Sequence, residues 1–209
     1  MQLTSEGFLV EVGVDQHYDV LKELGDCHTA LGHYDRARQC YEEAALLAPD
    51  KPGPAVGLGV IGLQTGSLDA ADRAFGDALE IDPGCAEAYG GRAMVCQHRG
   101  DHAGAFDLYL ECLDKDADNL VALLGLFQAS CQMGSFAKVT RYLGIYLDRH
   151  PGDVSVLYCL ATLQARDGRF QEAAEALETI LALEPDNAEA ADLLREIRRK
   201  QVGAEAVSS

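Results

Sequence analysis

The sequence predicts an all-α protein built from repeated helix-turn-helix units. Its strongest indication is a glycine that recurs every 34 residues, at Gly32, Gly66, Gly100, Gly134 and Gly168. Leucine and alanine columns follow the same spacing, for example Leu24, Leu58, Leu126 and Leu160. A fixed period of this length indicates a stacked helical array. We therefore expect five units, at 18–51, 52–85, 86–119, 120–153 and 154–187.

The recurring glycines predict where the first helix of each unit ends. Glycine adopts the left-handed backbone conformation that closes a helix C-terminus. Ser67, Asp101 and Ser135 directly follow three of these glycines and are placed to cap the second helix. The sequence thus marks each turn twice, once by the glycine and once by the capping residue.

Two further columns predict how the units pack and where they end. A large residue recurs in the second helices and is expected to fill the space between units: Tyr41, Phe75, Tyr109, Leu143 and Leu177. Proline stops most of these helices, at Pro49, Pro83, Pro151 and Pro185. Asn119, Asp153 and Asn187 are placed to cap the first helix that follows.

The two ends of the chain follow the repeat pattern less clearly. Residues 1–17 are either an irregular N-terminal cap or, because Val10, Val12 and Val14 alternate with other residues, an extended arm. An arm formed by residues 8–14 would cause self-association. We expect residues 188–200 to form an amphipathic helix that caps the last unit, because the end of a solenoid needs covering. We expect a disordered tail at 201–209.

At residues 18–187 the chain resembles the tetratricopeptide repeat family, through the leucine, glycine, alanine and proline columns above. The family's aromatic residue near the start of the first helix is kept only as Tyr89, and Arg92-Ala93 replaces the Leu-Gly pair in the third unit. The resemblance implies a right-handed superhelical solenoid. It also implies a concave groove, lined by the first helices, that binds peptides, extended segments or helices.

The resemblance further implies which residues line that groove. The predicted lining is Asp19, Lys22, Glu23, Asp26, Val56, Gly57, Val60, Leu63, Gly90, Gly91, Met94, Gln97, Leu124, Gly125, Gln128, Tyr158 and Thr162. Its first unit is mostly acidic and its middle is apolar, with glycines at 57, 90, 91 and 125 that we expect to widen the channel. Lys22 lies among acids, which disfavours a clamp for a terminal carboxylate. The alternative is that these residues only pack on neighbouring helices.

Charge and composition exclude several classes of partner. The formal net charge is -17, which repels a phosphate backbone and disfavours binding to nucleic acid. No apolar stretch approaches the length of a transmembrane helix, so membrane insertion is not expected. Seven cysteines, an odd number, do not form a disulfide framework and suggest a reducing compartment. The start of the chain lacks a secretory signal, and we expect a cytoplasmic protein whose charged partners are basic.

Two patterns imitate chemical sites. Residues 57–62 match a dinucleotide-binding pattern, but that pattern must follow a strand and open a helix, whereas these glycines fall inside a predicted helix. Cys96, His98 and His102 could suggest zinc, but Gly100 interrupts the helix between the two histidines. We therefore expect no cofactor, no metal site and no enzyme activity.

The leading functional hypothesis is a noncatalytic scaffold or adaptor that binds an apolar peptide or helix in its groove. One alternative is a chaperone for an aggregation-prone client, similar to the acidic tetratricopeptide chaperones of secretion systems. Another is an accessory domain of a larger enzyme system.

Overall fold

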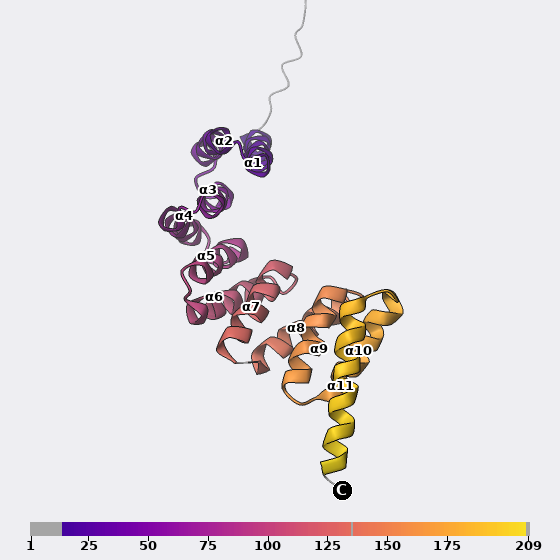
Figure 1. Cartoon of the computed structure of the whole chain (residues 1–209). Helices are drawn as coiled ribbons and strands as arrows, with labels where there is room; N and C mark the ends of the chain where they lie inside the picture. Colours follow the sequence, from indigo (N-terminus) through magenta and orange to yellow (C-terminus); the bar gives the residue numbers. More distant parts are fainter. Residues whose placement is uncertain (1–13, 135, 208–209) are drawn as a thin grey trace, which may run out of the picture. The chain divides into compact units, whose positions relative to one another are not determined.

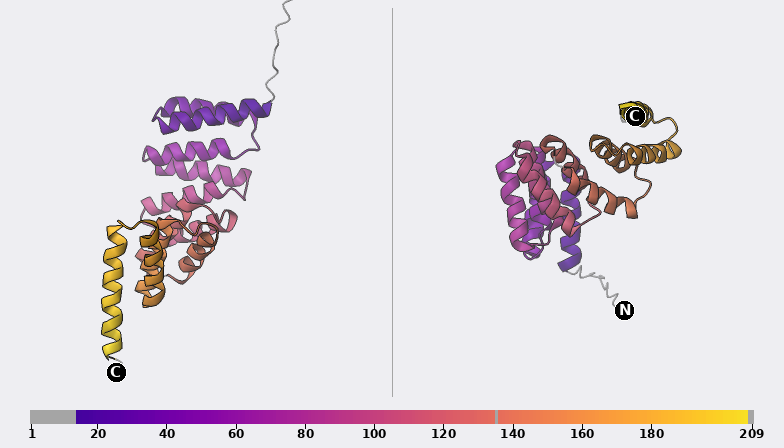
Figure 2. Two further views of the ribbon diagram at one scale, coloured as in Figure 1. Left: turned by 90° about the vertical axis from the view of Figure 1, so that its right-hand side faces the viewer. Right: turned by 90° about the horizontal axis from the view of Figure 1, so that it is seen from below.

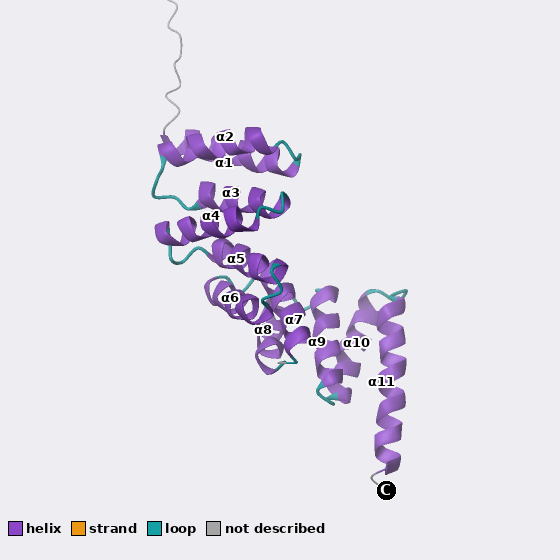
Figure 3. Ribbon diagram, turned by 60° about the vertical axis from the view of Figure 1, so that its left-hand side comes forward, coloured by secondary structure: helices purple, strands orange, loops and turns teal. Residues whose placement is uncertain are grey.

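We analysed a computed structural model that describes residues 14–134 and 136–207. Every regular element in this part of the chain is a helix, and Figure 3 shows no strand there. Contacts divide the chain into two compact parts, an N-terminal part at 1–95 and a C-terminal part at 96–209. Figure 1 labels the helices along the sequence. The predicted all-α repeat solenoid is confirmed.

The N-terminal part holds two complete helix pairs and most of a fifth helix. Its helices are α1 (Val14–Ala30), α2 (Tyr34–Leu47), α3 (Gly53–Gln64), α4 (Leu68–Ile81) and α5 (Ala86–His98). Within this part α1 packs against α2 and α3, α2 against α3, and α3 against α4. The helices of the first two pairs lie side by side in Figure 2.

The C-terminal part continues the pattern. Its helices are α6 (His102–Lys115), α7 (Leu120–Met133), α8 (Ala137–Arg149), α9 (Val154–Arg166), α10 (Phe170–Leu183) and α11 (Ala188–Val207). Each of them packs against the next along the chain. Helices α9, α10 and α11 share one apolar cluster, in which Leu177, Ile180 and Ile197 are almost completely buried.

The recurring glycines close the first helices as predicted. All five have a positive φ, between 70° and 78°, at Gly32, Gly66, Gly100, Gly134 and Gly168. No residue other than glycine has a positive φ in the described part of the chain. A side chain at these turns would strain the backbone, which explains why the column is invariant along this sequence.

The predicted helix caps are confirmed at four positions and wrong at one. Asp101, Asn119, Asp153 and Asn187 each accept a hydrogen bond from a backbone N–H three residues further on. Ser67 occupies the capping position of α4 but makes no such bond. Its hydroxyl instead accepts a hydrogen bond from the Thr65 hydroxyl at 3.3 Å. Ser135 lies outside the described residues.

Both terminal helices are longer than predicted. Helix α1 starts at Val14 rather than near Tyr18, because Asp15 stands where later repeats carry the proline that keeps loop and helix apart. An acidic residue in the first turn also interacts favourably with the helix dipole. Helix α11 continues to Val207, so the expected disordered tail is wrong for 201–207. Gln, Ala and Glu in that stretch are good helix formers.

The large residues of the second helices fill the space between repeats, as expected. Tyr41, Phe75, Tyr109, Leu143 and Leu177 are at most 1% exposed. The ring of Tyr41 lies between glycines of two successive first helices, Gly25 in α1 and Gly57 in α3. Phe75 has the same relation to Gly59 and Gly91. Since a Cβ atom at any of these glycines would overlap the ring, glycine sets how closely the helices approach.

Candidate functional site

The N-terminal part contains a cavity of about 410 Å³ between its first helices. The lining includes five predicted groove residues, namely Lys22, Asp26, Val56, Gly57 and Val60. Val56 and Val60 supply apolar wall, and both also pack on the buried cluster around Phe75. This size and mixed lining are typical of a pocket for a small ligand or for one or two side chains.

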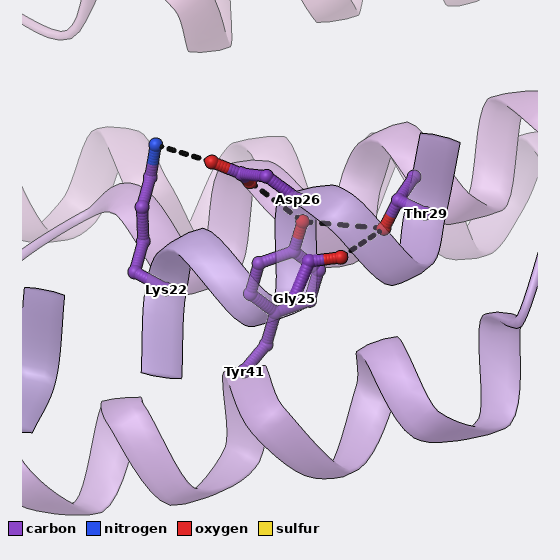
Figure 4. Close-up of polar contacts among 5 residues, drawn as sticks. All are labelled: Lys22, Gly25, Asp26, Thr29 and Tyr41. Atoms are coloured by element: carbon purple, nitrogen blue, oxygen red, sulfur yellow. Dashed lines mark hydrogen bonds and ion pairs between the residues drawn. The ribbon is translucent and has the colours of Figure 1, made fainter. Parts of the chain in front are cut away.

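A chain of polar contacts forms one wall of the cavity (Figure 4). Lys22 Nζ lies 2.7 Å from Asp26 Oδ2 in an ion pair. The Tyr41 hydroxyl donates to Asp26 Oδ1 at 2.8 Å and lies 3.2 Å from the Thr29 hydroxyl. Thr29 in turn donates to the carbonyl of Gly25 at 2.8 Å. Helix α2 thus fixes the position of a carboxylate on α1.

The surroundings raise the pKa of two groups in this wall, Lys22 and Tyr41. The hydrogen bond from Lys22 to Asp26 raises the pKa of the lysine, so this lysine stays charged at neutral pH. Burial raises the pKa of the Tyr41 phenol, which therefore remains a neutral donor. The wall accordingly carries an ion pair and a neutral hydroxyl.

The lining contains a second acid, Glu87, but only one base, Lys22. Glu87, from α5, lines the cavity, accepts a long contact from the Cys85 thiol at 3.6 Å, and interacts electrostatically with Lys22. Burial raises the pKa of the Cys85 thiol, so the thiol adds no negative charge of its own. With Lys22 held by Asp26, the remaining charge at the cavity is negative.

Sequence reasoning missed several lining residues. Tyr41, Pro52 and Cys85 line the cavity although they lie outside the positions taken from the family pattern. Tyr41 could have been found, because Asp26 and Thr29 supply polar groups in the columns where the next repeat has Val60 and Leu63. A tyrosine next to polar partners predicts a hydrogen bond.

Of the predicted lining residues in the first two repeats, three take no part in the cavity. Asp19 and Glu23 are exposed on α1 and are not in its lining. Leu63 packs instead against the buried cluster around Phe75. For Leu63 the alternative interpretation, packing on neighbouring helices, is the one that the structure supports.

At Gly57, Gly91 and Gly125 the missing side chain does not widen a channel, and the expectation is wrong at these three positions. A Cβ at Gly57 or Gly91 would overlap the ring of Tyr41 or Phe75, and one at Gly125 would overlap the ring of Tyr109. The space left by the missing side chains is therefore filled by aromatic rings. Gly90 and Met94 are half-buried in α5.

In the C-terminal part the predicted residues form a separate polar network. The Tyr109 hydroxyl donates to Gln97 Oε1 at 2.7 Å, and Gln97 Nε2 donates to Gln128 Oε1 at 2.6 Å. Burial raises the pKa of Tyr109 to about 12. The hydroxyl of a buried tyrosine is thus satisfied by a partner on a first helix, as for Tyr41.

The remaining predicted positions in this part are divided between partial exposure and packing. Leu124 is half-buried on α7. Tyr158 packs against the cluster of α9, α10 and α11. The Thr162 hydroxyl donates to the Tyr158 carbonyl at 2.8 Å, which satisfies it within its own helix.

The patterns that imitate chemical sites have structural explanations. Gly57, Gly59 and Gly62 lie inside α3, where Gly59 faces Phe75 and Gly62 faces the backbone of Ala71. Among the residues described, no three His, Cys, Asp or Glu side chains are grouped as a metal site would require. The described helices also include none that is long and apolar enough to cross a membrane.

Comparison with known families agrees with the repeat geometry. Models of the tetratricopeptide repeat match residues 18–51, 63–119 and 141–197. The chain belongs to the tetratricopeptide repeat family, whose fold supports protein–protein interaction.

Individual relatives are similar over different extents. "Cellulose synthase 1 operon protein C" of Komagataeibacter xylinus is 29% identical over an alignment of 154 residues, and the match covers 66% of this chain and 11% of that protein. The chain thus spans about a tenth of that relative. The solved structure of PilF from Pseudomonas aeruginosa superposes with a TM-score of 0.73 at 18% identity, covering 94% of this chain and 89% of that one.

A peptide complex is also among the similar structures. The first tetratricopeptide domain of Spaghetti (RPAP3), solved with the HSP90 peptide SRMEEVD, has a TM-score of 0.51 and 22% identity. It covers 57% of this chain and 95% of that one. At these identities the structural similarity defines the fold alone.

Proposed function

We propose that this chain is a noncatalytic adaptor that binds a peptide or helix through the cavity of its N-terminal part. The observation that carries the proposal is the convergence of Val56 and Val60 with Asp26 and Glu87 around one cavity of about 410 Å³. Such a volume accepts one or two anchoring side chains of a longer segment. Peptide recognition of this kind uses a few anchors in a groove.

The anchor should be apolar. Val56 and Val60 are both only partly buried, so a ligand can remove more of their surface from water. Burial of apolar area stabilises a complex by about 25 cal/mol per Å². An apolar side chain placed between α1 and α3 would gain this contribution without breaking the hydrogen bonds of Tyr41.

A basic residue should flank the apolar anchor. The lining holds two acids, Asp26 and Glu87, and one base, Lys22, which is paired with Asp26. A lysine or arginine of the partner can therefore pair with Glu87 at the rim. Charge pairs in such positions act more on the association rate and on orientation than on affinity. A terminal carboxylate would meet this excess of acid, which disfavours a carboxylate clamp.

Site-specific photocrosslinking in cells tests the proposal. A benzophenone amino acid replaces Gln64, an exposed residue of the cavity lining, or Gln39, an exposed glutamine of α2 outside it. We expect adducts at position 64, and mass spectrometry should assign them to segments with an apolar residue next to lysine or arginine. Adducts that form mainly at position 39 would place the partner on the outer face and contradict the proposal.

The same adducts distinguish the two alternative roles. A chaperone should capture one aggregation-prone client, whereas an adaptor should capture a member of a stable complex. An accessory domain should capture a segment of an enzyme. The last role is suggested by the relative of which the matched region covers only 11%.

A further inference from the structure

The C-terminal part contains a second cavity, of about 540 Å³, between α6 and α8. Helix α6 lines this α6–α8 cavity with three acids, Asp107, Glu111 and Asp114. These are four and three positions apart, so they share one face of the helix. Helix α8 lines it with two bases, Lys138 and Arg141. The cavity therefore has one negative wall and one positive wall.

The charges of the two walls are not paired with each other. Among the residues described, neither Lys138 nor Arg141 makes an ion pair, whereas Arg149 at the end of the same helix pairs with Asp118 at 3.0 Å. Lys138 Nζ instead lies 6.0 Å from the centroid of the Phe106 ring on α6. The chain has 34 acids for 17 bases, so a base finds acids easily. The cavity thus separates charges that attract each other.

Tyr142 of α8 connects the two walls. Its hydroxyl donates a hydrogen bond to Asp114 Oδ1, so one of the three acids already has a partner. This hydrogen bond and burial raise the pKa of the Tyr142 phenol, Glu111 adds to the rise, and Arg141 opposes it. Charges from both walls therefore act on the same hydroxyl. The other two acids and both bases stay open to a ligand.

The pair of bases occurs only in the fourth repeat. At intervals of 34 residues, the positions of Lys138 and Arg141 hold Arg36 and Gln39, Ala70 and Arg73, Gly104 and Asp107, and Glu172 and Glu175. No other second helix carries a base at both positions. The pair is therefore not needed to build the repeat.

We propose that the α6–α8 cavity binds a basic amino acid, either free or at the C-terminus of a peptide. The ligand carboxylate accepts hydrogen bonds from Arg141, whose fork of N–H donors matches a carboxylate, and from Lys138. The ligand cation pairs with Asp107 and Glu111. Three acids against two bases leave the lining with an excess of negative charge, which favours a ligand with a cationic side chain.

The size and the apolar surface of the cavity also suit such a ligand. Its volume lies in the range that is usual for small-molecule sites. Leu110, half-buried in the same lining, offers apolar surface to the aliphatic part of a lysine or arginine. The site lies wholly in the C-terminal part, and the inference does not depend on the cavity of the N-terminal part or on the proposed adaptor function.

A chemical-shift titration of the isotopically labelled full chain with L-lysine tests the proposal. We expect saturable shifts at backbone amides of α6 and α8, with a dissociation constant of about 1 mM at low salt. L-lysinamide, which lacks the carboxylate, should bind at least about ten-fold more weakly. Because lysinamide carries more positive charge, general attraction to an acidic chain would instead make it bind more tightly. Binding of lysinamide as tight as that of lysine would overturn the proposal.

Two variants locate the site. Arg141→Gln should weaken lysine binding at least about ten-fold. Arg73→Gln is the matched control, because Arg73 occupies the same column in α4, is exposed and lies outside the lining, and it should leave the affinity unchanged. An equal loss in both variants, or no saturable shift up to about 20 mM lysine, would also overturn the proposal.

Nα-acetyl-L-lysine distinguishes the two sources of the ligand. It keeps the carboxylate and the side-chain cation but blocks the α-amino group, as a peptide bond does. Affinity equal to that of lysine supports a peptide C-terminus, and affinity weaker than that of lysine but tighter than that of lysinamide supports a free amino acid. Affinity no better than that of lysinamide would show that the carboxylate is not recognised together with the side chain, and would contradict the proposal.

Discussion

Gly57 of α3 lies directly against the ring of Tyr41 of α2, so that a Cβ atom at this position would overlap the ring. Gly57 is buried and lines the cavity. The contact positions the tyrosine hydroxyl against Asp26, and it ties the spacing of successive repeats to the geometry of the candidate site.

Gly57→Ala should therefore destabilise the fold. Overpacking of a filled interior costs about 1–3 kcal/mol, which outweighs the gain of about 1 kcal/mol in helix propensity. Gly76→Ala is the matched control, because Gly76 lies inside α4 with nothing within 4 Å of a Cβ atom. Urea unfolding should show a loss for the first variant and a gain for the second. An equal gain in the free energy of unfolding for both variants would mean that the Tyr41 ring moves aside without cost.

A hydroxyl on the large aromatic residue of a second helix should stabilise the fold only where it has a hydrogen-bond partner. Tyr41→Phe removes hydrogen bonds to Asp26 and Thr29 and should cost about 1 kcal/mol. Phe75→Tyr places a hydroxyl in an apolar cluster against which Val60 and Leu63 pack, and it should cost about 1–3 kcal/mol without a partner. Thermal melts of both variants check this. A stabilising Phe75→Tyr substitution would contradict the packing described.

The stability of the C-terminal part should fall at alkaline pH. Burial raises the pKa of the Cys159 thiol from 9.0 to about 11. The unfolded chain therefore loses this proton first, and stability that is complete below pH 9 declines until about pH 11. The decline should amount to about 2–3 kcal/mol, at 1.36 kcal/mol per pKa unit.

Comparison with Cys159→Ala isolates this effect. The variant loses packing at every pH, but its stability should lack the alkaline decline caused by the thiol. Urea unfolding at pH 8 and pH 10.5 measures both proteins. A difference between them that is the same at the two pH values would show that Cys159 does not titrate in this range.

Glu87 should steer a basic partner. Glu87→Gln should lower the association rate of a basic peptide by several-fold in low salt, with little effect on dissociation. Exposed charges are screened in salt, so the difference should vanish near 1 M salt. Stopped-flow fluorescence measures both rates. Glu80→Gln is the control, because Glu80 is an exposed residue of α4 and lies outside the cavity lining. An unchanged association rate for Glu87→Gln in low salt would show that Glu87 does not steer the partner.

The 34-residue columns predicted most of the fold because each column has one physical role. Gly32 and its equivalents need a positive φ, and Asp101 has an N–H to cap. Ser67 shows the limit of this reasoning, because a local bond with Thr65 takes the place of the cap. The extra turn of α1 follows from the absence of a proline, and a missing residue predicts a helix boundary less clearly than a proline that is present.

The candidate site was predictable only in part. Lys22, Asp26, Val56 and Val60 followed from their positions on the first helices. The role of Gly57 did not, because removal of a side chain looks the same in a sequence whether the space stays open or receives a ring from another helix. The contribution of Tyr41 depends on the approach of α2 to both α1 and α3, which is a property of packing.

In the proposed function, the cavity between the first helices of the N-terminal part binds an apolar anchor. Peptides of about 12 residues selected from a random display library against the full chain provide the probe. Val60→Asp would bury a carboxylate against the anchor and should weaken binding by at least about ten-fold. Leu46→Asp is the control, since Leu46 is 84% exposed on α2 and outside the cavity lining.

Fluorescence anisotropy with one selected peptide, labelled at its end, gives the dissociation constant for each protein, after circular dichroism has shown that the variants are folded. The account predicts a large loss for Val60→Asp and an affinity for Leu46→Asp equal to that of the unmodified chain. Unchanged binding by Val60→Asp together with loss of binding by Leu46→Asp would place the peptide on the outer helices and contradict the account.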